Sequence, residues 1–388
     1  MVILGLNLRA AVTTVPPLLD RIQAEVQLSP AAVSLIAAAP PLMFAIFGSL
    51  APFLGRRWGL ERVIAGAMAV GALGMGLRAL TSSEFIFLVG TGAAMAGLGG
   101  ANVAVPPLIK RYFPDRIGLM TTASTLFLVA GQALPPAIAV PLADQVGWRW
   151  AAGIWAVGAA LAALPWFVQP YRLSRRQRGK KTARPRLGPI KVTTSYVFWG
   201  ITGLLICNSA AAYALIGWLP RIMTDAGASA HRGAVWLTIF TAGSLLPAMV
   251  VPALTIRLRR PWLLIVTMYL SWTVGLVGLW LWPLHGTAWW IALTRIGDGN
   301  YACAITLMNL RTRTSQTVLT VSGLAQAIAY TVAAAATFAF GQLQAFSGSW
   351  HWPFILLICT MPLGLAGGLL ASRQTYVEDQ VARTPSQP

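Results

Sequence analysis

Three charged side chains lie where the surrounding chain is too apolar to be solvated by water. Arg9 lies in the first apolar run, and Arg295 and Asp298 lie in a later one, in the stretch TRIGDGNY. Arg9 is about 12–15 Å from either end of its run at helical rise. An arginine at that depth costs at least about 3 kcal/mol, so intramembrane charge is usually functional. Because a guanidinium forms a planar fork of donors, two such residues favour an anionic or strongly polar ligand.

Asp298 is the carboxylate that we place near mid-membrane, three residues after Arg295 and on the same helix face. One interpretation is a permanent ion pair that only holds the fold together. The other is a switchable network in which Asp298 neutralises Arg9 or Arg295 between substrate loads. We expect Asp298 to be ionised in the empty protein, to compete with an arriving anion, and then to take up a proton. A static counter-ion that never titrates is the alternative.

The composition of the chain identifies the medium that surrounds these charges. The 388 residues are 56% hydrophobic and only 10% charged, against roughly 25% charged residues in soluble domains. The chain is therefore predicted to be an integral membrane protein, and its 16 Trp, 14 Phe and 8 Tyr exclude a disordered one. The net charge of +19 would suggest nucleic acid in a soluble protein. Here the basic residues lie between apolar spans, which makes them a topology signal and excludes a nucleic-acid partner.

Segments long enough to cross the hydrocarbon number about twelve by the 20-residue criterion. We expect them at 1–21, 31–54, 62–80, 84–109, 117–142, 149–168, 196–220, 233–255, 262–283, 286–309, 317–342 and 352–371. The predicted fold is an all-α membrane protein of two six-helix bundles. Residues 1–168 and 192–372 form the bundles, 169–191 a basic linker and 373–388 a tail. Lys and Arg gather in the loops on the linker side, so both termini are expected in the cytoplasm.

The two halves repeat at an offset of about 200 residues. Equivalent positions then carry the same residue type in five pairs: Pro52 and Pro252, Arg57 and Arg257, Gly97 and Gly297, Gly99 and Gly299, and Arg111 and Arg311. Internal repeats of six spans are typical of transporters, whose substrate lies between the halves near the membrane midplane. They argue against a channel or a membrane receptor, which are the rivals from other classes.

The stretch GSLAPFLGRRWG, Gly48 to Gly59, resembles the signature between spans 2 and 3 of the major facilitator superfamily, with Pro52 in place of its usual acid. Four more stretches resemble the cyanate/nitroimidazole transporter family of that superfamily. They are LNLRAAVTTVPPLLD, IKRYFPD, IGWLP and SGLAQ. The resemblance implies the major facilitator fold, in which spans 1, 4, 7 and 10 line a central cavity.

By that resemblance a set of polar residues is expected to contact the substrate. They are Arg9, Asn102, Asn208, Tyr213 and Arg295, with Gln132, Gln326 and Tyr330 from the next layer of helices. For each Asn, Gln or Tyr, an interhelical hydrogen bond of about 0.6 kcal/mol is the alternative role. Asp298 is the candidate for proton coupling. Arg56, Arg57 and Arg257 are candidate gating residues that hold the outward-open state. Trp218 is either an outer gate or part of an interfacial tryptophan belt.

These features predict a secondary transporter that works by rocking of two bundles. The expected substrate is a small polar or cyanate-like anion, with coupling to protons as one form. The alternatives are efflux of a neutral nitrogen heteroaromatic such as a nitroimidazole, and a passive facilitator or channel. No Walker A or HExxH pattern is present, and the three cysteines have no metal-ligand spacing. We therefore expect no enzyme activity, cofactor or metal, and a monomer in the cytoplasmic membrane of a prokaryote.

Overall fold

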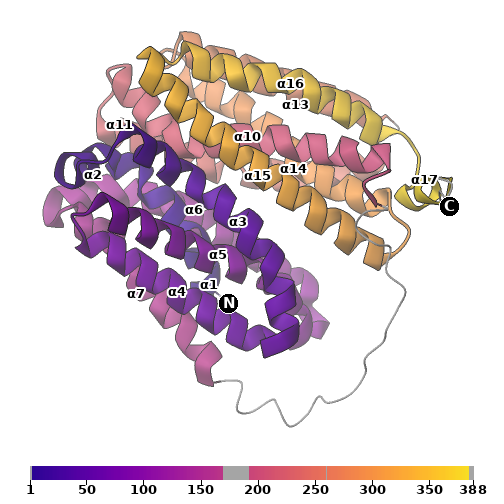
Figure 1. The fold of residues 1–388 in the computed structure, drawn as a ribbon. Coiled ribbons are helices and arrows are strands. Elements are labelled where there is room, and N and C mark those ends of the chain that lie inside the picture. The colour runs from indigo at the N-terminus through magenta and orange to yellow at the C-terminus, as the bar shows by residue number, and fades with distance from the viewer. Residues whose placement is uncertain (1, 169–191, 259, 384–388) are drawn as a thin grey trace, which may run out of the picture.

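The computed structural model describes residues 2–168, 192–258 and 260–383 (Figure 1). These described residues form α-helices, joined by short loops and two 3-10 turns. Ten of the described helical segments are long and apolar enough to cross a membrane. The predicted linker, 169–191, lies outside the described residues.

The first half of the chain forms the helices coloured indigo to magenta in Figure 1. They are α1 (Val2–Thr14), η1 (Pro16–Leu18), α2 (Leu19–Val26), α3 (Pro30–Trp58), α4 (Leu60–Leu80), α5 (Glu84–Tyr112), η2 (Pro114–Arg116), α6 (Ile117–Val146) and α7 (Trp148–Val168). The second half forms α10 (Tyr196–Asp225), α11 (Ala230–Ala242), α12 (Leu245–Arg257), α13 (Pro261–Leu281), α14 (Thr287–Leu310), α15 (Ser315–Ser347), α16 (His351–Ser372) and α17 (Val377–Arg383).

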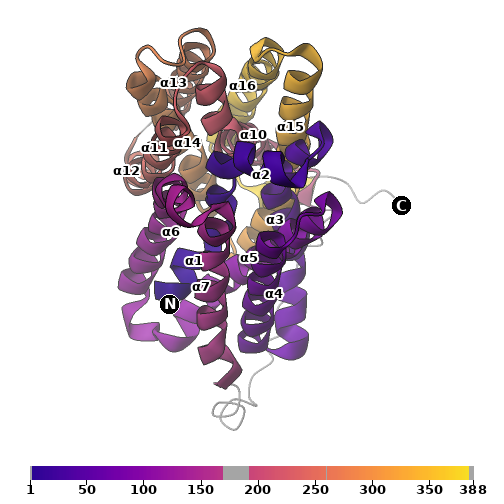
Figure 2. The ribbon, with the colours of Figure 1, turned by 90° about the vertical axis from the view of Figure 1, so that its left-hand side faces the viewer.

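The helices of the two halves form two groups that lie side by side (Figures 1 and 2). We call the end that carries the last turn of α7, the first turn of α10 and α17 the linker end. The opposite end, with α2 and the start of α11, is the far end. The groups meet at the far end and diverge toward the linker end (Figure 1). Pairs that join the halves include α15 with α3 and α11 with α6.

Small residues allow the helices of each group to approach closely. A Cβ on Gly97 of α5 would lie 2.5 Å from the backbone nitrogen of Gly71 in α4, so the two backbones are nearly in contact there. In the second half, a Cβ on Gly200 of α10 would lie 2.7 Å from the carbonyl oxygen of Gly367 in α16. Because apolar surface gains little by leaving lipid, such close packing is the main source of helix association in membranes.

Side-chain caps fix where several helices begin. Ser29 accepts a hydrogen bond from the Ala32 N–H at 3.2 Å, and Ser195 accepts one from the Phe198 N–H at 3.3 Å. Thr314 caps α15 in the same way through the Thr317 N–H at 3.1 Å. These caps satisfy donors that the first helical turn leaves without partners.

Two of the expected continuous spans are broken. The first span divides at Pro16 and Pro17, because proline lacks the N–H that a helix interior requires. The span expected at 233–255 divides into α11 and α12 at Gly243 and Ser244. The predicted tail contains a helix, α17, that was not expected. This helix contacts the linker end through Asp379, which pairs with Arg313 at 2.8 Å.

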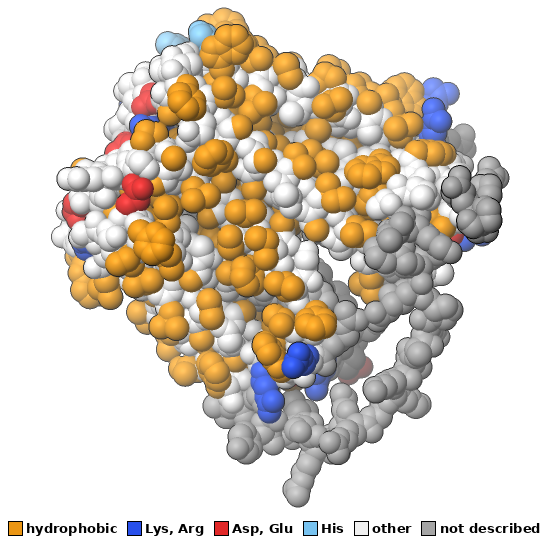
Figure 3. Space-filling view, in the orientation of Figure 1, with side chains coloured by type: hydrophobic (Ala, Val, Ile, Leu, Met, Phe, Trp, Pro, Cys, Tyr) orange, Lys and Arg blue, Asp and Glu red, His pale blue; other side chains and the backbone are white. Residues whose placement is uncertain are grey.

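The surface has the pattern of a membrane protein (Figure 3). Hydrophobic side chains cover the middle of the face shown, while acidic and basic side chains gather near its two ends. Ion pairs lie at both ends: Arg149 with Glu25 at 3.1 Å at the far end, and Arg111 with Glu61 at 2.8 Å at the linker end. Arg21 pairs with Asp144 at the far end as well.

Two of the twelve expected spans are not among the ten candidate spans, because their helices do not meet the criterion of length and apolarity. They are α1, which ends after 13 residues, and α14, which carries Arg295 and Asp298. These are the helices that hold the three intramembrane charges predicted to be functional. The polar residues that make them poor membrane spans therefore coincide with the expected site.

Candidate substrate site

A cavity of about 250 Å³ lies between the two halves of the chain. Its walls come from α1 and α6 of the first half and from α10, α12, α14 and α15 of the second. It brings together seven of the predicted site residues: Arg9, Gln132, Asn208, Tyr213, Arg295, Asp298 and Tyr330. The surface is indented between the two groups on the side of the linker end (Figure 3).

Arg9 projects from α1 and is held by groups from both halves. Its Nη1 donates a hydrogen bond to the hydroxyl of Tyr213 on α10 at 3.0 Å. The guanidinium carbon lies 5.2 Å from the ring centre of Phe44 on α3, which is within the range of a cation–π contact. Among the described residues, no carboxylate pairs with Arg9. Its charge is therefore available to a ligand.

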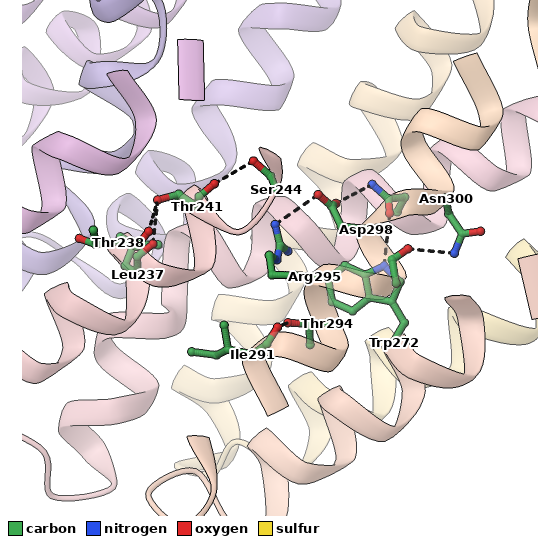
Figure 4. Close-up of polar contacts among 12 residues, drawn as sticks. Leu237, Thr238, Thr241, Ser244, Trp272, Ile291, Thr294, Arg295, Asp298 and Asn300 are labelled. Atoms are coloured by element: carbon green, nitrogen blue, oxygen red, sulfur yellow. Dashed lines mark hydrogen bonds and ion pairs between the residues drawn. The ribbon is translucent and has the colours of Figure 1, made fainter. Parts of the chain in front are cut away.

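Arg295 is held more firmly, by residues of the second half only. Its Nη1 lies 3.2 Å from Oδ2 of Asp298 (Figure 4), which confirms the predicted pairing on one helix face. Its guanidinium carbon lies 3.4 Å from the ring centre of Phe240 and 5.8 Å from that of Trp272. The Nε and Nη2 atoms are buried without a hydrogen-bond partner. Two nitrogen atoms of the guanidinium thus have unused N–H donors.

The break between α11 and α12 makes room for the Arg295 side chain. A Cβ on Gly243 would lie 2.8 Å from Cγ and 3.1 Å from Cδ of Arg295. Those distances are too short for a side chain larger than hydrogen, so glycine is required for this arginine rotamer. The neighbouring Ser244 donates to the carbonyl of Thr241 at 2.8 Å and lines the cavity (Figure 4).

Asp298 belongs to a chain of hydrogen bonds across three helices. The amide of Asn208 on α10 donates to Oδ1 of Asp298 at 3.1 Å, and its own oxygen accepts from Nε1 of Trp272 on α13 at 3.2 Å. Figure 4 shows this chain leading from Trp272 through Asp298 to Arg295. Each carboxylate oxygen therefore has a partner, and the alignment of Arg295 is fixed by α10, α13 and α14 together.

Three tyrosines form an aromatic wall beside Arg9. The rings of Tyr213 and Tyr330 meet edge to face at 5.9 Å, and the hydroxyls of Tyr301 and Tyr330 lie 3.4 Å apart. Tyr330 also contacts Phe44 at 6.4 Å between ring centres. The wall gives the cavity π surfaces as well as hydroxyl groups.

Tyr301 was not among the predicted site residues, although it lines the cavity. Its sequence position could have revealed it, because it follows Asp298 by three residues and therefore shares its helix face. Spacing along one helix could not have revealed Phe240 or Trp272, because each lies on a different helix, many residues away from Arg295.

Two predicted site residues are not placed in the cavity lining. Asn102 lies on α5, which packs against α3 and α4 of its own group. Gln326 donates to Ser322 on its own helix at 2.7 Å. We expected α1 and α5 to line the cavity from the first half. The lining residues of the first half come instead from α1 and α6.

Trp218 is buried between helices and does not belong to an interfacial tryptophan belt, which corrects one of its two expected roles. Its side chain is 2% exposed. Its Nε1 donates to the carbonyl of Thr337 on α15 at 3.4 Å, and its ring lies 6.0 Å from that of Trp350. Gly341 packs under this ring, since a Cβ there would lie 2.8 Å from Cη2. Trp218 thus packs in the interface between α10 and α15.

The candidate gating arginines lie at the linker end. Arg57 and Arg257 are both exposed, and the side chain of Arg56 lies outside the described residues. Nearby, Glu61 pairs with Arg111 at 2.8 Å and accepts a hydrogen bond from Tyr112 at 2.9 Å. Burial and the bond to Glu61 raise the pKa of the Tyr112 hydroxyl to about 12, so it stays a donor at physiological pH.

The charges around the cavity do not cancel. Arg9 and Arg295 contribute two positive charges, and Asp298 contributes one negative charge among the described lining residues. The lining is therefore formally positive by one unit. A monovalent anion would complete the neutralisation that the protein leaves unfinished.

Residues 1–337 of the chain match the Major Facilitator Superfamily, and the chain belongs to this superfamily. It is 30% identical to the uncharacterized transporter YycB of Bacillus subtilis (strain 168), over 97% of this chain and 93% of that protein. It is 29% identical to the 2-nitroimidazole transporter of Escherichia coli (strain K12), over 97% and 95%. The cyanate transport protein CynX of the same organism is 25% identical, over 91% and 92%.

The fold is similar to that of a D-xylose–proton symporter, with a TM-score of 0.74 and 13% identity over 98% of this chain and 97% of that one. The predicted fold class is thereby confirmed: an all-α transporter of the major facilitator type. The resemblance to the cyanate/nitroimidazole transporter family is confirmed as well.

Proposed function

We propose that the chain is a secondary transporter of a small, cyanate-like anion. The observation that carries this proposal is the cavity between the halves, where Arg9 and Arg295 approach from opposite halves and the lining has one uncompensated positive charge. Arg295 has unused donors, and the contacts of Arg9 with Tyr213, Tyr330 and Phe44 are all with neutral groups, without a carboxylate among the described residues. A small anion could therefore displace Tyr213 from Arg9 without breaking an ion pair.

The proposed mechanism is alternating access by rocking of residues 1–168 against residues 192–372. Contacts across the halves support a closed far end: Arg221 donates to Gln23 at 3.0 Å, and Gln342 donates to Ser34 at 3.0 Å. The close approach of Gly217 to Ala37, where an added Cβ would be 3.0 Å from the Ala37 Cβ, belongs to the same seam. At the linker end Arg57 and Arg257 are exposed. The described conformation thus opens toward the linker end.

The proposed topology places the linker end, both termini and residues 373–388 in the cytoplasm. Basic loops are retained on the cytoplasmic side, and most Lys and Arg of this chain belong to the linker-end loops. With this orientation the described conformation faces inward. The bacterial relatives support a location in the cytoplasmic membrane. The proposal takes the transporter to work there as a monomer.

Proton coupling through Asp298 is the finer form of the proposal. An anion that binds Arg295 would compete with the carboxylate for the same fork, and a carboxylate that loses its partner binds a proton more readily. Anion and proton would then move in the same direction. In the static form, Asp298 stays bonded to Asn208 and Arg295 throughout the cycle.

The Asp298→Asn substitution separates the two forms. If Asp298 carries the proton, the variant loses accumulation driven by a pH gradient but keeps exchange of substrate for substrate. Accumulation that still responds to the gradient would exclude Asp298 as the carrier of the proton. Loss of exchange as well would indicate a structural role.

Transport of a neutral nitrogen heteroaromatic, in the direction of efflux, is a second candidate function. The tyrosine wall favours it, since Tyr213, Tyr301 and Tyr330 offer faces and edges on which a flat ring could stack. A volume of about 250 Å³ also exceeds what a three-atom anion fills. The relative named as a 2-nitroimidazole transporter supports the same class of solute.

The test is transport by the purified protein in liposomes. Radiolabelled cyanate and 2-nitroimidazole are supplied outside, with unlabelled solute inside to reveal counterflow. Saturable, trans-stimulated flux of the anion is the expected result, and flux of the heteroaromatic alone would favour the second function. Flux that is not stimulated from the trans side would indicate a channel or passive facilitator. A thermal-shift screen of small anions and heteroaromatics identifies further ligands.

A further inference from the structure

A second, smaller cavity lies next to the substrate cavity, on its far-end side. It measures about 20 Å³ and lies among α1, α3, α4, α5 and α10. Most of its lining is apolar, and its charged side chain is Arg78 of α4, with Thr91 of α5 as a polar neighbour. Tyr213 and Ile216 line both cavities and separate them.

Arg78 is more deeply buried than either arginine of the substrate cavity. Its side chain is 0% exposed, although its position near the end of a predicted span suggested a surface residue at the outer side. Nη1 and Nη2 both reach the carbonyl oxygen of Ala11, each at 3.4 Å, and Nε is buried without a partner. Within the described part of the chain, no carboxylate pairs with it.

The surroundings of Arg78 do not neutralise its charge. It lies in the last turn of α4, where the helix dipole favours a positive charge. That effect is small compared with the cost of removing an unpaired guanidinium from water. The long contacts to a single carbonyl add little, because hydrogen bonds weaken beyond about 3.2 Å. Arginine cannot escape by losing its proton. A fully buried cation therefore lacks a counter-charge.

We propose that Arg78 binds a small monovalent anion, a halide or a pseudohalide, in this second cavity. A single water molecule needs about 10–15 Å³ of such space, so about 20 Å³ admits one small ion. Water would satisfy hydrogen bonds but would leave the charge uncompensated. The hydroxyl of Thr91 is also buried without a partner and can donate to the same ion. The space is too small for a heteroaromatic ring.

The site does not depend on which solute occupies the larger cavity. Its ligand is held within one half of the chain by Arg78 and Thr91, while the substrate cavity depends on Arg9 and Arg295. Tyr213, which accepts the hydrogen bond from Arg9, forms the wall between the two. Movement of Tyr213 would therefore connect the anion at Arg78 with the substrate cavity.

Bromide is the probe, because its anomalous scattering locates it directly. The full-length protein is crystallised with bromide as the only halide. The expected result is an anomalous peak in contact with the guanidinium of Arg78 and the hydroxyl of Thr91. A map with a peak only at Arg9 or Arg295, or with no peak at all, would overturn the proposal.

Thermal unfolding gives a second, independent measurement. In the Arg9→Gln background, which weakens binding in the substrate cavity, the melting temperature should rise with bromide concentration, since a ligand that binds the folded state stabilises it. Adding Arg78→Gln should abolish this rise, whereas adding Arg232→Gln, at an exposed arginine of the far end, should leave it unchanged. An equal rise in the Arg78→Gln variant would contradict the site. If that variant fails to fold, the bromide map decides alone.

Discussion

The two arginines of the substrate cavity are held in opposite ways. Arg295 has its carboxylate and its aromatic contacts within the second half, from Asp298, Phe240 and Trp272 (Figure 4). Arg9 belongs to the first half, but its hydrogen-bond acceptor Tyr213 belongs to the second. When the halves move relative to each other, the surroundings of Arg295 can move as one body, whereas the Arg9–Tyr213 bond must change.

This difference assigns different tasks to the two walls of the cavity. The second-half wall is preorganised, because a connected set of hydrogen bonds leaves Arg295 one favoured orientation. The first-half wall is adjustable, since Arg9 has no carboxylate partner among the described residues and its hydrogen bond to the Tyr213 hydroxyl contributes only about 1.5–3 kcal/mol. We infer that a solute docks first on Arg295 and that capture by Arg9 accompanies closure of the cavity. The predictions below test this contrast, from the largest expected effect to the smallest.

The largest effect should follow from removing Asp298. Asp298→Ala leaves the buried Arg295 charge without its carboxylate and should lower the free energy of unfolding by about 3 kcal/mol. The double variant Arg295→Met with Asp298→Ala removes both charges and should recover much of that loss. Chemical denaturation in detergent measures both changes. A double variant as unstable as the sum of its parts would show that the pair is not a unit.

Arg9→Lys should affect transport and leave folding intact. A lysine keeps the charge but not the planar fork, so transport should fall about 10–100-fold, which corresponds to one lost charge-assisted hydrogen bond. Uptake into liposomes measures the loss, and thermal unfolding checks the fold. Arg232→Lys is the matched control, because this arginine is exposed at the far end. Wild-type affinity in Arg9→Ala would contradict the assigned role of Arg9.

The position of charged residues within apolar runs was sufficient to predict three residues that line the cavity. Arg9, Arg295 and Asp298 stand out because a charge within an apolar run is rare and its cost can be read locally. The partners that lie on other helices could not be predicted from spacing in the same way. Tyr213, expected at the site from the family resemblance, is 204 residues from Arg9, and the Phe240 ring comes from α11, on the far side of Gly243 from α12. Such contacts depend on how helices pack, which residue spacing within one helix does not contain.

Arg78 shows the limit of the same reasoning. It lies two residues before the end of α4, a position from which an arginine ordinarily reaches water. Here the first span bends at Pro16, and the Ala11 carbonyl of α1 covers the end of α4. The burial thus follows from a neighbour that is remote in sequence. Asn102 is the converse case: it is polar and lies within a span, but it does not line the cavity, and its helix α5 packs against α3 and α4 of its own group.

Gly243→Ala should disturb Arg295 without changing its chemistry. The new methyl group would lie 2.8 Å from Cγ of Arg295 and would push the side chain off its position on Phe240. Overpacking of this kind costs about 1–3 kcal/mol. We expect a weaker apparent affinity for substrate, measured as a higher KM in liposomes. Gly92→Ala is the control, because a Cβ there meets nothing within 4 Å. An unchanged KM would show that the position of Arg295 does not limit binding.

The smallest effect should come from the linker end. Arg57 is exposed in the described conformation, so neutralising it should cost little here. In the opposite conformation, the linker ends of the two halves close, and Arg57 can approach the negative ends of helices from the other half. A charge near a helix C-terminus contributes about 0.3–1 kcal/mol. Arg57→Gln should therefore shift the population about 2–5-fold toward the conformation open at the linker end, by the conversion of free energy to population.

Pulsed spin-label distances can measure this shift. Labels at Arg62 and Arg260 lie at exposed positions of the linker end in opposite halves, and Cys359→Ser removes the exposed native thiol. Arg57→Gln should increase the fraction with the longer distance. Arg116→Gln removes the same charge from another exposed position at that end and should not. An equal shift in both variants would assign the effect to net charge. If neither variant changes the distances, Arg57 is not a gating residue. The balance between the two conformations would then depend on the far-end contacts of Gln23 and Ser34 with their partners.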